Sequence, residues 1–187
     1  MEDAGADGLL IVTPYYNRCT ESGLISHYEK IADDVSIPII MYSVPSRTGV
    51  NITPSAVAAL SQHPNIAGIK EASGNISQIC QIASYIGDGF DMYSGNDDQT
   101  VPLMSLGGIG CISTVSNIIP ARFANMTRDF LNGNYIQAGK EQVAIKPLID
   151  SLFVEVNPVP VKAALNMMRM CNLEYRLPMC PPSNKTQ

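Results

Sequence analysis

Apolar residues gather in five short runs through the first two thirds of the chain, and a polar turn follows each run. The runs are GLLIVT at 8–13, IPIIMYSV at 37–44, NIAGIK at 65–70, FDMYSG at 90–95 and GIGCIST at 108–114. The first two runs are apolar almost throughout, which is typical of parallel strands that are covered on both faces. We therefore predict a strand at each run.

Helical patterns separate these predicted strands. Thr53 and Pro54 provide an N-cap and a first-turn proline for a helix over 55–60. Apolar residues between 76 and 86 keep the i, i+3, i+4 rhythm of a helix, and a shorter pattern uses Leu24, Tyr28 and Ile31. The alternation of strands with helices predicts a parallel α/β fold.

The pattern changes after residue 115, where strand signals cease. Three helices are predicted at 120–131, 135–153 and 159–170, the second interrupted by Pro147. Met167, Met168 and Met170 on the last helix are expected to fill the core. The proline-rich tail at 178–187 is expected to be extended or disordered. We divide the chain into an α/β part at 1–119 and a C-terminal helical region with this tail at 120–187.

Composition excludes several classes of function. With 45% hydrophobic and 16% charged residues the chain is globular, and a net charge of −5 without a Lys/Arg run argues against nucleic acid or an anionic membrane as a partner. No window approaches the roughly 18 apolar residues of a membrane span. The five cysteines form no CxxC pair, and neither His27 nor His63 has a partner at ligand spacing. We expect a reduced, cytoplasmic protein without a metal or cofactor.

Polar residues at the strand ends are the candidates for chemistry, because parallel α/β folds place active sites there. Tyr16, Tyr42, Arg47 and Lys70 all follow or end a predicted strand. An amine condenses with a ketone, a phenol relays protons and a guanidinium holds a carboxylate, so this set suits carbonyl chemistry. By spacing alone, a solvated lysine and ordinary surface residues explain the same positions. Asp97-Asp98 is interpreted as a solvated turn rather than an acid–base pair.

Seven segments carry a resemblance to a known family. They are GADGLLIVTPYYN, IPIIMYSVPSRTG, NIAGIKEASGN, SGNDD, GGIGCIS, LFVEVNPVPVKAAL and RLPMCPPS, in family order. With these segments the chain resembles the dihydrodipicolinate synthase family, among the class I pyruvate-dependent aldolases that include N-acetylneuraminate lyase. The resemblance implies a lyase of lysine biosynthesis that uses pyruvate and a small aldehyde, aspartate semialdehyde.

The resemblance also implies roles for individual residues. Lys70 matches the lysine that forms a Schiff base with pyruvate, and Tyr42 matches the tyrosine that shuttles protons above it. Tyr16 matches the tyrosine that crosses a dimer interface into a partner's proton relay. Arg47 matches the arginine that binds the carboxylate of aspartate semialdehyde. Two backbone positions are expected to line the pyruvate pocket, Gly95 and Ile112.

The sequence departs from the family in its extent. Members are full (β/α)8 barrels, and this chain matches them from the fourth strand onward, so we expect a partial (β/α)8 (TIM) barrel of strands 4–8 followed by a C-terminal helical segment. The family's Gly-Thr-Thr-Gly turn, which contacts the pyruvate carboxylate, does not occur in these 187 residues. Impaired synthase activity is therefore expected, and the alternative is a non-catalytic truncated homologue that serves as an oligomeric relic or a regulatory or assembly module. Open sheet edges predict self-association, as a domain-swapped dimer or a higher oligomer.

Overall fold

The computed structural model describes residues 1–87 and 89–183. The chain forms two compact units, one over Met1–Ile112 and the other from Ser113 onward. Each unit is described by itself.

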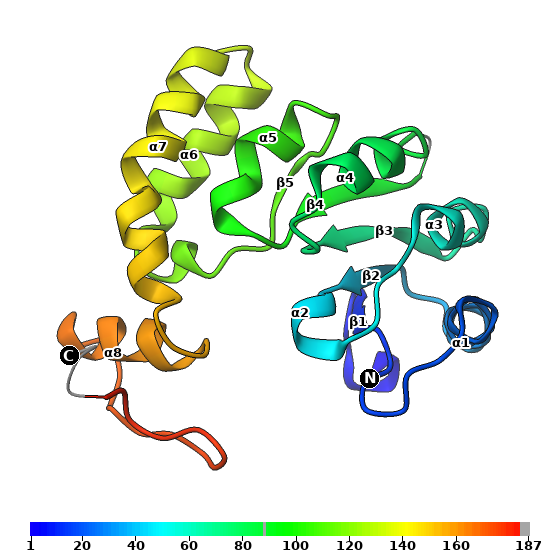
Figure 1. Ribbon diagram of the computed structural model, residues 1–187, viewed down its shortest axis with the longest axis horizontal. Helices are drawn as coiled ribbons and strands as arrows, with labels where there is room; N and C mark the ends of the chain where they lie inside the picture. Colours follow the sequence, from blue (N-terminus) through cyan, green and yellow to red (C-terminus); the bar gives the residue numbers. More distant parts are fainter. Residues whose placement is uncertain (88, 184–187) are drawn as a thin grey trace. The chain divides into compact units, whose positions relative to one another are not determined.

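A five-stranded parallel sheet forms the centre of the first unit (Figure 1). Its strands are β1 (Leu9–Val12), β2 (Ile39–Ser43), β3 (Ile66–Glu71), β4 (Asp91–Ser94) and β5 (Gly110–Cys111), and they lie side by side in chain order. Every neighbouring pair is parallel. The five predicted strands are confirmed, and because they are parallel their C-terminal ends all lie on the same side of the sheet.

The register between β2 and β3 contains one irregularity. Ile39 pairs with Ile66, but Ile40 pairs with Gly68, so β3 carries Ala67 as an extra residue. Beyond this bulge the ladder is regular up to its end.

Within the described residues of the first unit, five helices and two short 3-10 turns accompany the sheet. They are η1 (Glu2–Ala4), α1 (Glu21–Asp34), α2 (Pro45–Thr48), α3 (Pro54–Leu60), α4 (Ile76–Ala83), η2 (Asp97–Gln99) and α5 (Thr100–Met104). Helix α3 begins as predicted, with the Thr53 hydroxyl accepting from Ala56 N. Helix α1 is longer than its pattern predicts, because Thr20 caps it by accepting from Gly23 N. Helices α2 and α5 have four and five residues, too few for a periodic signal.

One face of the sheet carries the core of this unit. Helices α1, α3 and α4 contribute Leu24, Tyr28, Val57, Leu60, Ile79 and Ile82, which pack with Ile39, Met41, Ile69 and Met92 of the strands. Alternate strand residues point to the opposite face. That face is more exposed, and Leu10 on it is 46% exposed. The continuous apolar runs are therefore well covered by helices on only one side within the described residues.

The second unit is helical. It contains η3 (Val115–Asn117), α6 (Pro120–Leu131), α7 (Tyr135–Leu152) and α8 (Val159–Met167), which confirms the three predicted helices. Helix α7 continues through Pro147, so the predicted interruption is wrong. Proline removes a bond to the carbonyl of Val143, but Val143 lies on the exposed side of α7. Buried Ile145 and Ile149 hold the helix on either side of the proline.

Helix α8 ends three residues before the predicted boundary. Its C-cap is Met168, and Arg169 follows in the left-handed region with a φ of 60°. The chain turns there, and Met167, Met168 and Met170 are exposed, so the expectation that they fill the core is wrong. Residues 178–183 lie outside helices and strands, while the last four residues of the predicted tail lie outside the described part of the chain.

No helix within residues 1–87 and 89–183 has the length and apolar character that a membrane span requires.

Candidate active site

Three polar side chains form a row at the C-terminal ends of the central strands. Tyr42 of β2, Lys70 of β3 and Tyr93 of β4 are direct partners in the sheet. Partners in a parallel ladder point to the same side, and this row shares the more exposed face with Leu10. All three side chains of the row are half-buried. The sheet thus presents an amine between two phenols at the C-terminal ends of its strands, where parallel folds place their active sites.

Lys70 lies against the ring of Tyr42. The Lys70 Nζ is 4.1 Å from the centroid of that ring. Burial lowers the pKa of Lys70, and the charge of Arg47 lowers it further, while Cys111 and Asp97 act in the opposite direction. A lowered pKa increases the fraction of neutral amine at a given pH, and the neutral amine is the nucleophilic form. Lys70 therefore differs from a fully solvated lysine at a strand end.

The Tyr42 hydroxyl is held in its protonated form. Burial raises the pKa of Tyr42, and the nearby charge of Arg47 offsets only part of this effect. A protonated phenol beside an amine can donate a proton to the carbonyl oxygen of a ketone that the amine attacks. The pair therefore combines a nucleophile with a proton donor.

Two backbone positions fix the space around Lys70. Gly95 N donates to the Glu71 carbonyl at 2.7 Å, and Ile112 N donates to the Ser94 carbonyl at 2.9 Å. A Cβ on Gly95 would lie 2.6 Å from the Ala72 Cβ and 3.2 Å from the Lys70 Cε. Only glycine leaves room for the lysine side chain at this point.

Arg47 and Tyr16 are both exposed. Arg47 is an exposed residue of α2, near enough for its charge to affect both Lys70 and Tyr42. Tyr16 lies in the loop between β1 and α1, with a φ of 67° and 91% of its surface exposed. The Tyr16 ring is therefore not packed against Tyr42 or Lys70 of the same chain.

The sequence patterns missed two buried carboxylates near the lysine. Glu71 is 1% exposed and Asp97 is 3% exposed. The prediction of a solvated turn is wrong for Asp97, because η2 folds it inward, where the Cys111 thiol donates to Asp97 Oδ1 across 3.8 Å. Asp98 is exposed, as expected. For Glu71 the side of the sheet was predictable, since it follows Lys70 in β3 and adjacent strand residues face opposite sides. Asp97 lies in the three-residue η2, where no local pattern indicates burial.

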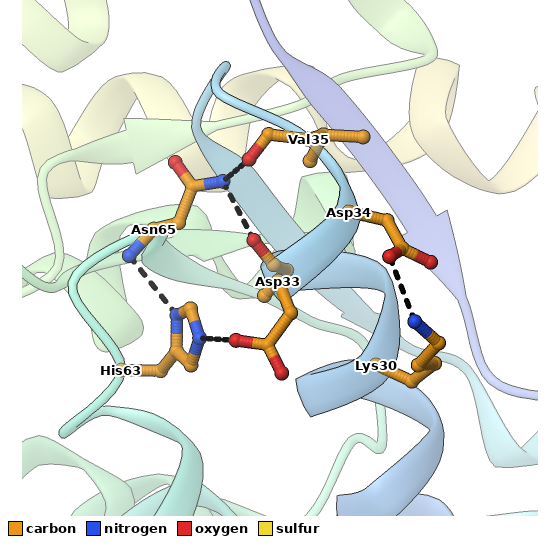
Figure 2. A network of polar contacts seen from close by, with 7 residues as sticks. Lys30, Asp33, Asp34, Val35, His63 and Asn65 are labelled. Carbon is orange, nitrogen blue, oxygen red and sulfur yellow. Dashed lines mark hydrogen bonds and ion pairs between the residues drawn. The ribbon is translucent and has the colours of Figure 1, made fainter.

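A second polar network joins the C-terminal end of α1 to the segment before β3 (Figure 2). His63 Nε2 lies 3.2 Å from Asp33 Oδ1, and His63 Nδ1 accepts from the backbone N–H of Asn65. The Asn65 amide donates to the carbonyls of Ala32 and Val35. Both ring nitrogens of His63 are thus engaged in polar contacts, and the network fixes the end of α1. Within the described residues, no group of three or more His, Cys, Asp or Glu side chains is placed to hold a metal.

Comparison with known proteins decides the family. The sequence matches the Dihydrodipicolinate synthetase family over residues 1–187. The chain belongs to the dihydrodipicolinate synthetase family. The 4-hydroxy-tetrahydrodipicolinate synthase of Caldicellulosiruptor saccharolyticus is 52% identical over 186 residues, which are 100% of this chain and 63% of the relative. That of Thermoanaerobacter sp. (strain X514) is 50% identical over 98% of this chain and 62% of its own length.

Solved members of the dihydrodipicolinate synthetase family share the fold. The dihydrodipicolinate synthase of Thermotoga maritima superposes with a TM-score of 0.96 at 43% identity, over 99% of this chain and 64% of that chain. The parallel sheet and its helices thus match part of the family fold. The chain spans about 62% of the length of the curated relatives.

Proposed function

We propose that Lys70 forms a Schiff base with pyruvate, and that the chain carries the nucleophile of a dihydrodipicolinate synthase-type lyase. The observation that carries this proposal is the half-buried Lys70 amine, 4.1 Å from the centre of the Tyr42 ring. Its pKa is lowered by burial, which favours the neutral amine that the reaction needs. The family resemblance supplies the identity of the keto acid.

The chemistry follows from these positions. The neutral Lys70 nitrogen attacks the keto carbon of pyruvate, and Tyr42 passes both nitrogen protons in turn to the carbonyl oxygen, which leaves as water and gives the imine. A base removes a methyl proton from the imine to give an enamine. The enamine carbon adds to the aldehyde carbon of aspartate semialdehyde, and the proton is returned to the aldehyde oxygen. In this proposal Arg47 binds the carboxylate of the aldehyde substrate, and the backbones at Gly95 and Ile112 line the pyruvate pocket.

The proposal includes an assembly in which another copy completes the site. We assign the five strands to positions 4–8 of a (β/α)8 barrel in a cytoplasmic homo-oligomer. The exposed face that carries Leu10, and the 91% exposed Tyr16 ring, support self-association. In this assembly Tyr16 reaches the proton relay of a partner copy. Exchange of strands or helices is one way to cover the open face.

Turnover by these 187 residues alone is proposed to be weak. They contain no Gly-Thr-Thr-Gly turn, so donors for the pyruvate carboxylate must come from other residues. By the family resemblance, that turn also supplies the threonine that links the two tyrosines of the proton relay, and loss of a relay partner costs on the order of 10²–10⁴ in rate. The same absence favours a second candidate function, a non-catalytic oligomeric module that keeps the reactive lysine.

Reductive trapping tests the proposal. The protein is incubated with pyruvate and borohydride, and digestion followed by mass spectrometry locates the adduct. We expect a pyruvyl adduct on Lys70 that Lys70→Ala abolishes. Absence of an adduct, or equal labelling of Lys70→Ala, would refute the Schiff-base role. A coupled synthase assay then separates turnover from pyruvate binding alone.

A further inference from the structure

A buried hydrogen-bond network lies directly behind Lys70. Glu71 follows the lysine in β3 and points to the opposite, helix-covered face, where it is 1% exposed. Glu71 Oε1 accepts from Gln78 Nε2 at 2.9 Å, and Oε2 accepts from Ser73 N at 3.0 Å. None of the ion pairs recorded for residues 1–87 and 89–183 includes Glu71. Directional hydrogen bonds from neutral groups therefore hold this buried carboxylate.

The network continues from Gln78 to the neighbouring strand. Asn51 Nδ2 donates to Gln78 Oε1 at 2.7 Å, and Asn51 Oδ1 accepts from Gln78 Nε2 at 3.2 Å. The Ser43 hydroxyl donates to the same Asn51 oxygen at 3.3 Å. Ser43 ends β2 as Glu71 ends β3, so the chain of hydrogen bonds joins the two strand ends through α4.

These are the strand ends that carry the reactive pair on their other face. Tyr42 precedes Ser43, and Lys70 precedes Glu71. In the ladder, Tyr42 pairs with Lys70 and Ser43 pairs with Glu71. The Glu71 carbonyl also accepts from Gly95 N at 2.7 Å, and the Ser43 carbonyl accepts from Ala72 N at 2.9 Å. A rotation of either strand end that breaks the network would therefore move Lys70 relative to the Tyr42 ring.

We propose that Glu71 and Gln78 are positioning residues for the Lys70–Tyr42 pair, acting through their hydrogen bond from the helix-covered side of the sheet. The inference rests on the proposed function of Lys70. Catalytic groups must be held within about 0.5 Å of their productive geometry, and a misplacement of about 1 Å can cost about 10²-fold in rate. A network of buried, directional bonds provides this precision where the other face of the sheet is exposed.

Exchange of donor and acceptor tests the proposal. Glu71→Gln leaves one acceptor oxygen for two donors, Gln78 Nε2 and Ser73 N, so one of them faces an amide NH2. Gln78→Glu sets two carboxylates together. The double variant restores one donor and one acceptor in reversed order. We expect the rate of pyruvate trapping per folded molecule to fall about tenfold or more in each single variant. It should recover to within about threefold of the unmodified protein in the double variant. Gln81→Glu, the same change at an exposed position of α4, should leave the rate unchanged.

The pH dependence of Lys70 acetylation by acetic anhydride provides a readout that does not depend on pyruvate. Opening of the site lets water reach Lys70, so its pKa should rise toward the ordinary lysine value in both single variants and return in the double variant. In Glu71→Gln, loss of a negative charge alone would shift the pKa downward, opposite to the expected direction.

Three outcomes decide between the alternatives. If the folded single variants keep the pKa of Lys70 and the trapping rate, or if the double variant does not recover them, the network serves stability only and the inference is wrong. Asn51→Ala, which removes only the outer link, provides a milder variant should the singles fail to fold, and we expect a loss of about two- to fivefold. If the unmodified protein forms no pyruvate adduct, the proposed function fails, and the acetylation profile still tests positioning.

Discussion

Substitution of Gly95 by alanine would remove the space that Lys70 occupies. The added Cβ would lie 2.6 Å from the Ala72 Cβ, about 1 Å inside the usual carbon–carbon contact of 3.5–4.0 Å. Ala72 cannot move freely, because its N–H donates to the Ser43 carbonyl at 2.9 Å. The Lys70 Cε, 3.2 Å from the new Cβ, can shift more easily. The overlap should therefore displace the lysine as well as strain the end of β4.

The expected cost of this overpacking is about 1–3 kcal/mol in the free energy of unfolding. Urea unfolding measures it as a lower midpoint with an unchanged slope. Trapping of pyruvate by borohydride, compared at equal amounts of folded protein, should slow by at least tenfold because the amine is displaced. Gly110→Ala is the matched control, since its Cβ would meet no atom within 4 Å. If Gly95→Ala matched the unmodified protein in both midpoint and trapping rate, the packing argument for Lys70 would be refuted.

Three further changes test other parts of the site. Tyr42→Phe keeps the ring beside Lys70 but removes the hydroxyl, so the trapping rate should fall on the order of 10²-fold while the urea midpoint changes little; an unchanged rate would contradict the proton role. Lys70→Met should raise the urea midpoint at pH 7. The folded-state pKa of Lys70 lies below that of the unfolded chain, so the stability of the unmodified protein rises with pH between the two values. The gain from Lys70→Met should shrink over that range, and a gain independent of pH would argue against desolvation of the amine. Leu10→Glu places a charge on the exposed sheet face and should shift sedimentation toward the monomer; a monodisperse monomer before mutation would contradict self-association.

The strands were predictable from sequence because each apolar run is bounded by polar turns. The run at 65–70 ends on Lys70, which lies at the C-terminal end of β3 in the structure. The short helix α2 was not predictable, since four residues carry no periodicity. The exposure of the methionines in α8 depends on where the chain turns at Arg169, which no local pattern records.

For the site, residue types indicated the amine, the phenol and the guanidinium. The burial of Glu71 and Asp97 could not be predicted from residue types. Their environment depends on Gln78 and Cys111, which lie seven and fourteen residues away in the sequence and meet them only in the fold. Sequence spacing can place a side chain on a strand end, but its desolvation depends on neighbours from other elements.

The extra residue in β3 bears on how the length of this chain can change. Deletion of Ala67 would leave Ile66 and Gly68 opposite Ile39 and Ile40, and the pairing toward the strand end would persist. Deletion of Ile69 would instead bring Lys70 opposite Met41 and turn the amine toward the helices. The bulge thus separates a stretch of β3 that can absorb insertions and deletions from one in which the loss of a single residue would exchange the two faces of the strand.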